Sequence, residues 1–362
     1  MKVVHFTSLH NRYDTRVFYK QCCHLAKEYD TTLIVADGKG NETLNNVKIL
    51  DVGKLAGLKN RILKTNRKIK DLAISLDADI YQFHDPELNL VAKQLIKQGK
   101  KLVYDAHENA PVQILANGNY TLGARLKSVG IKYIENSTAK NLSAVVTATS
   151  EIADRYKEFN ANVIVLRNYP LQSEFVALKQ WELRKDVIVY VGGISKHRGI
   201  FEILKAIEDT EIKFLLAGIF QPSSLHDKLK QEKGWKNVEF LGMLPRLEVV
   251  KLLNSSKIGM LNLYPTPNHK ISLPIKMFEY MLAGLATIYS DIPKWNTIMS
   301  EAKGGLKVDP YNVNSIKKAI HHLLDNQEEA KNLGLQARSA VLSNYIWENE
   351  VNNLLELYKQ II

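Results

Sequence analysis

The feature that most constrains the fold is the regular alternation of short apolar runs with helical patterns along the chain. The alternation begins with KVVHFTS, the helical segment RVFYKQCCHLAKEY and TTLIVAD, and it continues through DIYQFHD, KLVYDAHE, AVVTATS and NVIVLRN. Apolar β-rich runs separated by amphipathic helices are typical of βαβ units, which build parallel sheets covered by helices. The sequence therefore predicts an α/β protein.

The chain is long enough for two such units. It has 362 residues, and at about 150 residues per domain this length favours two domains. The alternation lapses in the stretch NYPLQSEFVALKQWELRKD, so we place the boundary near residue 170. It then resumes with the predicted strands VIVYVGGI, KFLLAGIF, VEFLGML, IGMLNLY, LATIYSD and GLKVD. Because doubly wound sheets bind ligands at the carboxyl ends of their strands, we expect a cleft between the two domains.

Charge and composition narrow the choice of partner. The formal net charge of +11 favours an anionic partner, namely nucleic acid, a phosphate-bearing ligand or an anionic membrane face. The N-terminus lacks the pattern of a secretory signal and no apolar run reaches the length of a membrane span, so we expect a cytoplasmic protein. The two cysteines, Cys22 and Cys23, are adjacent and predict neither a disulfide framework nor a metal site.

A segment of the first domain is both basic and amphipathic. It runs from Lys54 to Leu72, where cations alternate with leucine and isoleucine, and it predicts one helix. One interpretation is a helix that lies on an anionic bilayer; the other is a solvated helix packed on the sheet. The candidate membrane-facing residues are Lys59, Lys64, Arg67 and Lys68.

The segment YVGGISKHRGIFEILKAI places glycines and a cation between a strand and a helix. Gly192 and Gly193 would let the backbone approach a ligand, and Arg198 could form a bidentate contact with phosphate near the helix N-terminus. The pattern is neither G-x-G-x-x-G nor a P-loop. The alternative interpretation is an ordinary strand-to-helix turn with a solvated arginine.

The segment SLPIKMFEYMLAGLATIYSD predicts a helix that starts near Pro274 and ends at Gly284. Lys276 and Glu279 lie three residues apart on a face that differs from the buried stripe. They could form a surface ion pair. Alternatively, the lysine could face a phosphate while the carboxylate accepts the two ribose hydroxyls of a nucleotide.

Polar residues also follow predicted strands of the first domain. His107 ends the strand in KLVYDAHE, where it would face the cleft or serve as a structural hydrogen-bonding residue. Asp85 and Glu87 follow DIYQFH and are either polar cleft groups or acids at a helix N-terminus. Asp77 and Asp79 have the spacing of a metal-binding pair, but they precede their strand and are excluded because cleft ligands bind at the other end.

Taken together, these segments resemble the GT-B glycosyltransferases of the retaining GT4 family, also called glycosyltransferase group 1. The segments TRVFYKQCCHLAKEYDTTLIVAD, HDPE, YDAHE, VLRN, VGGISKHRG, SLPIKMFEYMLAGLATIYSD and YIWENEVNNLLELY follow the family's order over essentially the whole chain. The resemblance implies two doubly wound Rossmann-like domains that face each other across a cleft. Residues 1–170 would bind the acceptor and residues 171–345 the nucleotide sugar, and a C-terminal helix over residues 346–362 would pack back on the first domain.

The resemblance also implies roles for individual residues. Glu279 matches the second glutamate of the family's E-x7-E motif, which holds the donor ribose, and Arg198 matches a phosphate-contacting lysine. His107 matches a strand-end histidine that contacts the donor sugar and the reacting centre. The predicted catalytic residues are His107, Arg198 and Lys276. The predicted donor-binding residues are Gly192, Gly193, Arg198, Ser272, Pro274, Lys276 and Glu279, and the acceptor or cleft candidates are Arg16, Asp85 and Glu87.

The chain departs from the family pattern at three places. Ile271 stands where the first glutamate of E-x7-E is expected, and Gly193 stands where an arginine usually precedes the phosphate-contacting lysine. The segment HNRYDTR replaces the double-glycine loop near the N-terminus. These departures leave the donor sugar undetermined.

The resemblance implies a hexosyl or glycosyl transferase that moves a sugar, with retention, from a UDP- or GDP-sugar to a saccharide acceptor that is expected to be lipid-linked. The pathway would be surface polysaccharide, lipopolysaccharide or exopolysaccharide biosynthesis at the inner face of the membrane. No metal or cofactor is expected, because Arg198, Lys276 and a helix N-terminus could stabilise the leaving diphosphate. No nucleic acid is expected either, because it would account for the charge but not for the two-domain cleft. The alternatives are a nucleotide-sugar epimerase-like enzyme and a catalytically silent nucleotide-sugar-binding subunit.

Overall fold

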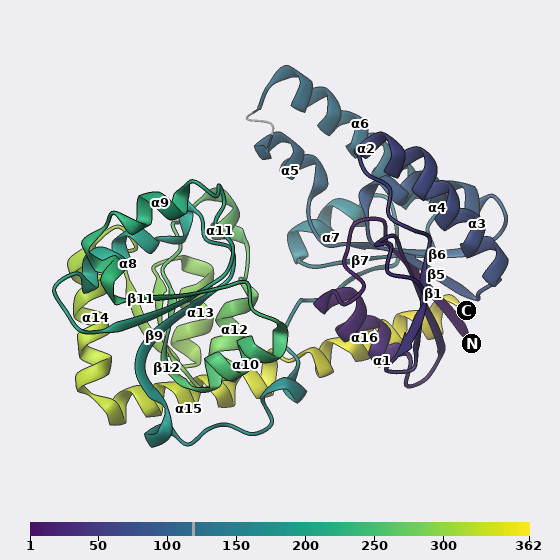
Figure 1. The fold of residues 1–362 in the computed structure, drawn as a ribbon. Coiled ribbons are helices and arrows are strands. Elements are labelled where there is room, and N and C mark those ends of the chain that lie inside the picture. Colours follow the sequence, from purple (N-terminus) through teal and green to yellow (C-terminus); the bar gives the residue numbers. More distant parts are fainter. Residues whose placement is uncertain (118–119) are drawn as a thin grey trace. The chain divides into compact units, whose positions relative to one another are not determined.

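A computed structural model describes residues 1–117 and 120–362, which form two α/β units (Figure 1). Unit 1 comprises Met1–Asn168 and Trp347–Ile362, and unit 2 comprises Tyr169–Ile346. The chain therefore leaves unit 1, builds all of unit 2 and returns to unit 1 for its last helix. Within the described ranges, no helix is long and apolar enough to cross a membrane.

Unit 1 is built on an eight-stranded sheet with the order β3-β4-β2-β1-β5-β6-β7-β8. The strand β3 is antiparallel to β4, and the other neighbours described in this sheet are parallel. The strand order reverses between β1 and β5, and in doubly wound sheets the ligand crevice lies at such a point. The strands are β1 (Lys2–Phe6), β2 (Asp30–Val35), β3 (Glu42–Leu44), β4 (Val47–Asp51), β5 (Ile80–Phe83), β6 (Lys101–Ala106), β7 (Ala144–Thr147) and β8 (Val163–Val165).

The strands β3 and β4 are the part of this sheet that the sequence analysis missed. They form a hairpin whose two-residue turn, Asn45 and Asn46, has φ of 50° and 62°. Asparagine tolerates such left-handed backbone, and two adjacent residues of this kind are typical of a tight hairpin turn. Because β3 is short and largely exposed, its apolar signal is weak.

Helices cover the sheet of unit 1, and the basic segment is one of them. The predicted helix from Lys54 to Leu72 is wrong at both ends, because helical structure begins at Leu58 and continues to Leu76. The positive φ of Gly53 and Gly57 keeps the preceding residues out of the helix. The helices of unit 1 are η1 (Thr15–Cys22), α1 (Cys23–Leu25), α2 (Leu58–Asn60), η2 (Arg61–Thr65), α3 (Asn66–Leu76), η3 (Pro86–Leu88), α4 (Asn89–Ile96), α5 (Ala110–Asn117), α6 (Leu122–Ala139), α7 (Ser150–Lys157) and α16 (Trp347–Ile361).

Unit 2 is built on a parallel six-stranded sheet with the order β11-β10-β9-β12-β13-β14. This is the doubly wound order, and its reversal lies between β9 and β12. All six apolar runs predicted as strands in this part of the sequence are confirmed. They form β9 (Lys185–Val191), β10 (Lys213–Ala217), β11 (Val238–Gly242), β12 (Ser256–Leu261), β13 (Ala286–Ser290) and β14 (Gly305–Val308).

The central helix of unit 2, α12, is buried along nearly its whole length. Tyr280 packs so closely on β12 that a Cβ at Gly259 would lie 2.5 Å from its ring. Lys276 and Glu279 are 8% and 6% exposed, so the interpretation as a surface ion pair is wrong. The helices of unit 2 are η4 (Gln172–Phe175), η5 (Trp181–Leu183), η6 (Lys196–Arg198), α8 (Ile200–Ile207), α9 (Leu225–Lys230), η7 (Lys233–Asn237), α10 (Arg246–Asn254), α11 (Pro267–Ile271), α12 (Ile275–Leu282), α13 (Pro293–Glu301), α14 (Val313–Asp325) and α15 (Gln327–Asn344).

Candidate functional site

In unit 2 the candidate residues gather where the strand order reverses. The loop 192–199 follows β9 at its carboxyl end, and Asn262 follows β12 next to it. Gly199 has φ of +64°, and a Cβ there would lie 2.1 Å from the Asn262 carbonyl oxygen. The Asn262 side-chain amide donates to the Gly199 carbonyl at 3.2 Å. Glycine is therefore required for the two strand ends to meet this closely.

Gly192 lies directly against the amine of Lys276. Its φ is +134°, and a Cβ at this position would be 2.6 Å from Lys276 Nζ. The amine donates to the Tyr190 hydroxyl at 2.8 Å and lies 4.1 Å from the centre of that ring. The Tyr190 hydroxyl in turn donates to the Gly193 carbonyl at 2.8 Å. The lysine is thus fixed beneath the backbone of the glycine loop.

The environment of Lys276 disfavours its charged form. Burial, and to a lesser degree the positive charge of Arg198, lower the pKa of Lys276 to about 7 against the opposing effect of Glu279. Among the ion pairs of the described residues, none involves Lys276. An anion bound beside the amine would replace the missing countercharge and favour protonation. This is the electrostatic arrangement expected of a phosphate site.

Arg198 is half-buried and faces a histidine that the sequence analysis did not select. Its Nη1 lies 3.4 Å from Nε2 of His269, whose Nδ1 is 2.6 Å from the Tyr264 carbonyl oxygen. A carbonyl only accepts, so Nδ1 carries the proton and Nε2 is free to accept from the guanidinium. His269 belongs to α11, the short helix between β12 and α12.

Glu279 does not pair with Lys276 but with Arg246, at the start of α10. Arg246 Nη1 lies 2.5 Å from Glu279 Oε1, and the same guanidinium forms a bidentate pair with Glu174 at 2.8 and 2.5 Å. One oxygen of Glu279 is therefore held in place by a half-buried cation, and the carboxylate is oriented before any ligand binds.

The other predicted donor residues surround α11 and α12. Ser272 ends α11, and its carbonyl accepts from Trp295 Nε1 at 2.8 Å. Pro274 directly precedes α12 instead of lying in its first turn. Ile271 is 53% exposed. At Gly193 a Cβ would be in ordinary contact, 3.7 Å from Gln221 Oε1, so this position does not require glycine.

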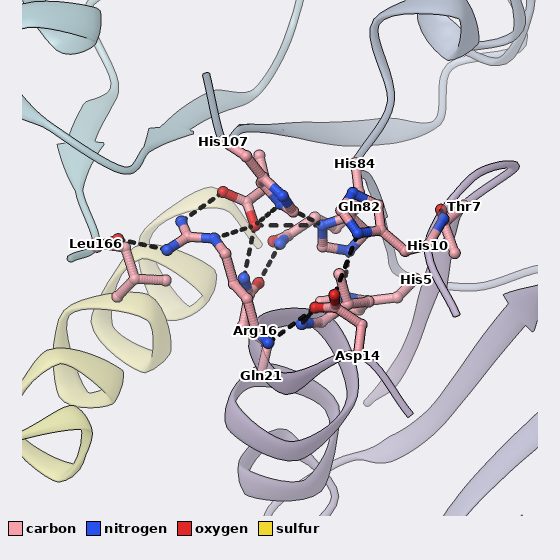
Figure 2. A network of polar contacts seen from close by, with 12 residues as sticks. His5, Thr7, His10, Asp14, Arg16, Gln21, Gln82, His84, His107 and Leu166 are labelled. Carbon is pink, nitrogen blue, oxygen red and sulfur yellow. Dashed lines mark hydrogen bonds and ion pairs between the residues drawn. The ribbon is translucent and has the colours of Figure 1, made fainter. Parts of the chain in front are cut away.

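In unit 1 the corresponding strand ends hold a buried polar network centred on Asp105 of β6 (Figure 2). Arg16 donates to its two carboxylate oxygens at 3.1 and 2.7 Å and to the Leu166 carbonyl at 2.8 Å. Burial would raise the pKa of Asp105, but the charges of Arg16 and His107 hold it well below its usual range. Arg16, predicted as an acceptor contact, is 4% exposed and is occupied within this network.

The direction of each hydrogen bond in the network follows from this carboxylate. Asp105 only accepts, so Gln21 presents its amide nitrogen at 2.6 Å. The Gln21 oxygen then accepts from Gln82 Nε2 at 2.5 Å, and the Gln82 oxygen accepts from the Tyr358 hydroxyl at 2.6 Å. Because the tyrosine proton is used, its oxygen must accept from the next member.

Three histidines, His5, His84 and His107, close the ring back to the carboxylate. His5 Nε2 lies 3.1 Å from the Tyr358 hydroxyl and must donate, while its Nδ1 lies 3.0 Å from His84 Nε2. Burial, followed by the nearby His84, keeps the pKa of His5 well below its usual range, so His5 is neutral and its Nδ1 accepts. Burial also lowers the pKa of His84, so this imidazole carries a single proton, which Nε2 donates to His5. Its Nδ1 then has no proton to give to Asp105, 3.2 Å away, and instead accepts from His107 Nε2. Because His107 Nε2 also contacts Asp105, the ring of hydrogen-bonded side chains closes on the carboxylate through His107.

His107 connects this ring to an open cavity of about 240 Å³ in unit 1. Its Nε2 lies 2.9 Å from Asp105 and 3.2 Å from His84 Nδ1, and its side chain is 16% exposed. The residues that line the cavity include His10, His84, Asp85, His107 and Glu108. The strand-end histidine predicted from the sequence therefore reaches a space that a polar ligand could enter.

Asp85 and Glu87 hold Thr7 and Ser8, which follow β1, in place beside this cavity. Asp85 is 1% exposed and accepts from the Thr7 hydroxyl at 2.8 Å and from the Ser8 amide at 2.6 Å. Glu87 accepts from the Ser8 hydroxyl at 3.0 Å and pairs with Arg61 at 2.7 Å. Asp85 is the N-cap residue of η3 and Glu87 lies in its first turn, so both are acids at a helix N-terminus, although the Asp85 carboxylate makes no capping bond.

His10 supplies a second imidazole to the cavity. Its Nδ1 lies 3.3 Å from Asp14 and its Nε2 lies 3.6 Å from Asp85. Burial lowers its pKa, but the carboxylates of Asp14 and Asp85 outweigh burial and raise the pKa of His10 above its usual value. This cavity therefore combines a histidine that favours its charged form with the buried, neutral His5 behind it.

Three of these side chains could hold a metal ion by distance alone. The donor atoms of His84, Asp105 and His107 lie 2.9 to 3.2 Å from one another. However, the Asp105 oxygen that faces both histidines already accepts from Arg16 and Gln21. The imidazoles are held by hydrogen bonds instead, from His107 Nε2 to Asp105 and from His84 Nε2 to His5.

Several partners that orient the candidate residues were not predicted from the sequence. His84 was visible in the segment HDPE, next to Asp85, and could have been selected by its position at a strand end. Arg246 and Tyr358 carry no such signal, because each meets its partner only through the tertiary fold.

Comparison with known proteins finds a match in unit 2. Residues 173–340, nearly the whole of unit 2, match the family described as Glycosyl transferases group 1. Spore coat protein SA of Bacillus subtilis is 23% identical over 190 residues, 49% of this chain and 49% of that protein. Glycogen synthase of Mycobacterium tuberculosis is 19% identical over 237 residues, 62% of this chain and 56% of that protein. The chain thus spans about half the length of these curated relatives.

Solved structures resemble the chain over its full length. Sucrose-phosphate synthase from Thermosynechococcus elongatus has a TM-score of 0.73 at 15% identity, covering 99% of this chain and 98% of that one. Anabaena HepE, solved in complex with UDP and glucose, has a TM-score of 0.72 at 12% identity, covering 99% and 100%. These similarities show the fold: the chain has two parallel-sheet, Rossmann-like domains of the GT-B type.

Proposed function

We propose, from the glycosyl transferases group 1 domain in unit 2, that this protein is a glycosyltransferase that uses a nucleotide-diphosphate sugar. The observation that carries the proposal is the buried Lys276, whose amine lies beneath the Gly192 backbone and beside Arg198 at the point where the strand order reverses. A buried lysine without a carboxylate partner is costly, and a bound diphosphate would supply the countercharge.

The donor would occupy the carboxyl edge of the sheet in unit 2. Its diphosphate would lie against the glycine loop, with Arg198 forming the bidentate contact and Lys276 the point charge. The carboxylate of Glu279, oriented by Arg246, would accept the two ribose hydroxyls. Ser272 and Pro274 would border the sugar.

Charge development explains how this site would promote transfer. As the bond between the sugar and the diphosphate breaks, negative charge grows on the leaving phosphate oxygen, and Arg198 and Lys276 are placed to stabilise it. Desolvation strengthens this interaction because the lysine is already buried. We therefore propose that sugar transfer needs neither a metal ion nor a cofactor. The retaining outcome rests on the family resemblance.

Unit 1 would supply the acceptor side of the reaction. The cavity beside His107 is lined by imidazoles and carboxylates that can bind sugar hydroxyls, and the closed ring behind it fixes the His107 ring orientation. His107 would position the reacting groups. The acceptor in this proposal is a saccharide, expected to be lipid-linked, in surface glycan biosynthesis at the inner face of the membrane.

A ligand screen tests the proposal directly. Purified protein is heated with UDP, GDP, ADP and their common sugar conjugates, without metal and then with added Mg²⁺. UDP is the first candidate, because it is the nucleotide in the Anabaena HepE complexes. A single nucleotide that raises the melting temperature of the wild type, but not of Arg198→Gln, supports the donor site. No shift with any nucleotide would contradict it.

Product analysis separates the alternatives. Incubation of the donor with a pool of lipid-linked saccharides should yield glycosylated acceptor and free nucleotide. Conversion of the donor to an isomeric sugar without acceptor would indicate the epimerase-like alternative. Binding without turnover in either assay would indicate a silent subunit.

A further inference from the structure

The helix α6 of unit 1 exposes an apolar stripe that no part of the proposed reaction uses. Leu122, Leu126, Val129 and Tyr133 are 74%, 68%, 66% and 74% exposed. They follow one another at intervals of four, three and four residues, which places them on one face of a helix. Large side chains this exposed and this regularly spaced form a continuous apolar ridge.

The stripe lies on the outer side of α6, and its second half, Val129 and Tyr133, borders an open cavity that Phe159 also lines. The buried residues of this part of the helix are Ala124 and Ser128, and the Ser128 hydroxyl donates to the Pro111 carbonyl at 2.9 Å. At about 100° per residue, these positions lie on the side of the helix opposite the stripe. Figure 1 shows the first turns of α6 extending beyond the sheet of unit 1. The apolar ridge is therefore presented to the surroundings.

The charges beside the stripe all have one sign. Arg125, Lys127 and Lys132 are exposed on α6. Between Glu108 and Glu135 the sequence contains these three cations and no aspartate or glutamate. A helix with an exposed apolar face flanked by cations fits the interface of an anionic bilayer, where the apolar side chains enter the acyl boundary and the cations meet lipid phosphates.

The basic helix selected from the sequence does not have this combination. Lys59, Lys64, Arg67 and Lys68 are exposed, but Ile69 and Ala73 on the same helix are fully buried in the core of unit 1. Leu63 is its only exposed large apolar side chain among the described residues. Its apolar face is thus occupied by the sheet, whereas that of α6 is not.

We propose that α6 docks unit 1 on an anionic lipid bilayer, with Leu122, Leu126, Val129 and Tyr133 inserted and the three cations on lipid phosphates. A second copy of the chain is a poorer occupant, because pairing two such stripes would bring like charges together. The inference does not depend on the proposed function, since docking is measured without donor or acceptor.

Vesicle sedimentation of the full chain tests the inference. Vesicles of phosphatidylcholine alone are compared with vesicles containing phosphatidylglycerol at physiological salt. We expect binding to the anionic vesicles. The partition coefficient of the double variant Leu126→Ser/Tyr133→Ser on anionic vesicles should be at least tenfold below that of the wild type. That of Lys127→Gln/Lys132→Gln should be about 30-fold lower, because each cation near the surface contributes about fivefold. All four side chains are exposed, so melting temperatures should match the wild type.

A matched variant on the basic helix of residues 58–76 controls for the loss of positive charge alone. Lys64→Gln/Arg67→Gln removes the same charge from the helix whose apolar face is buried, and we expect at most a few-fold loss. Equal losses in the two charge variants would overturn the assignment to α6, as would absence of wild-type binding to anionic vesicles. Analytical ultracentrifugation tests the second copy as occupant: a dimer that the serine variant abolishes, with vesicle binding unchanged, would also overturn the inference.

Discussion

Donor binding should consume a proton, because the free site holds Lys276 with a pKa of about 7. Burial and Arg198 disfavour the charged amine, whereas a bound diphosphate favours it, so the pKa of Lys276 rises on binding. A ligand that raises the pKa of a group binds its protonated form more tightly. Above pH 7, donor affinity should therefore fall about tenfold for each pH unit until the pKa of the complex is reached.

The structure sets the size of this effect. A lysine pKa lowered from 10.5 to about 7 corresponds to about 5 kcal/mol against the charged amine in the free protein. Because the folded-state pKa lies below the unfolded value, the unfolded chain binds more protons between pH 7 and 10.5, and stability rises with pH across that window. Below pH 7 the amine is charged in both states, and the full cost of burying it destabilises the fold.

Calorimetry in two buffers of different ionisation enthalpy measures the proton directly. The ligand should be an intact nucleotide-diphosphate sugar, whose phosphates do not titrate near neutral pH. At pH 8 we expect uptake of about 0.9 proton per donor by the wild type, since a group with a pKa near 7 is then about 90% deprotonated. Lys276→Met should bind more weakly at pH 7, show no proton uptake, and melt at a higher temperature than the wild type at pH 6.

Two results would refute this reasoning. One is the absence of proton uptake by the wild type at pH 8, and the other is the same pH dependence in Lys276→Met. Lys251→Met is the matched control, because this lysine of unit 2 is exposed and pairs with Glu248 on its own helix. It should leave affinity, proton uptake and melting temperature unchanged.

Three further predictions concern single side chains. Glu279→Gln should weaken donor binding 10- to 100-fold in calorimetry, because hydrogen bonds to a charged acceptor contribute about 1.5–3 kcal/mol, and unchanged affinity would remove this residue from the ribose site. Tyr358→Phe should lower the free energy of unfolding of unit 1 by about 1–3 kcal/mol and shift the imidazole ¹⁵N resonances of His5, and unchanged resonances would contradict the closed ring. Gly199→Ala should lower the melting temperature and abolish donor binding, because its Cβ would overlap a backbone oxygen. Gly193→Ala should keep the wild-type melting temperature, because a Cβ fits there. Equal stability of the two variants would contradict the loop geometry.

Much of the fold could be predicted because buried parallel strands leave a strong pattern in sequence. Strands covered on both faces appear as continuous apolar runs, and β9, β10 and β12 are of this kind. The hairpin of β3 and β4 escaped because an exposed edge strand has no such run. The ends of the basic helix were misplaced because charge and periodicity did not reveal the left-handed glycines that precede it.

The site was predictable residue by residue but not as a set of contacts. The positions of Gly192 and Lys276 beside strand and helix ends could be inferred from local sequence. Their close approach, in which a Cβ at Gly192 would lie 2.6 Å from Lys276 Nζ, depends on how α12 packs against the end of β9. The partner of Glu279 could not be inferred, because Arg246 lies 33 residues away and is brought near only by the packing of α10. Long-range partners of this kind are determined by tertiary packing.

Unit 1 is built from two separate segments of the chain, and this determines the order in which the two units can fold during synthesis on the ribosome. Unit 2 is one continuous stretch, so it can fold as soon as Tyr169–Ile346 has emerged. The segment Met1–Asn168 is translated first, but it lacks Trp347, which is fully buried in the finished unit, and the tyrosine that closes the histidine ring. Residues 1–168 can therefore be completed only after unit 2 has been synthesised, and until then the residues that pack on Trp347, Leu354 and Leu357 of α16 lack their partner.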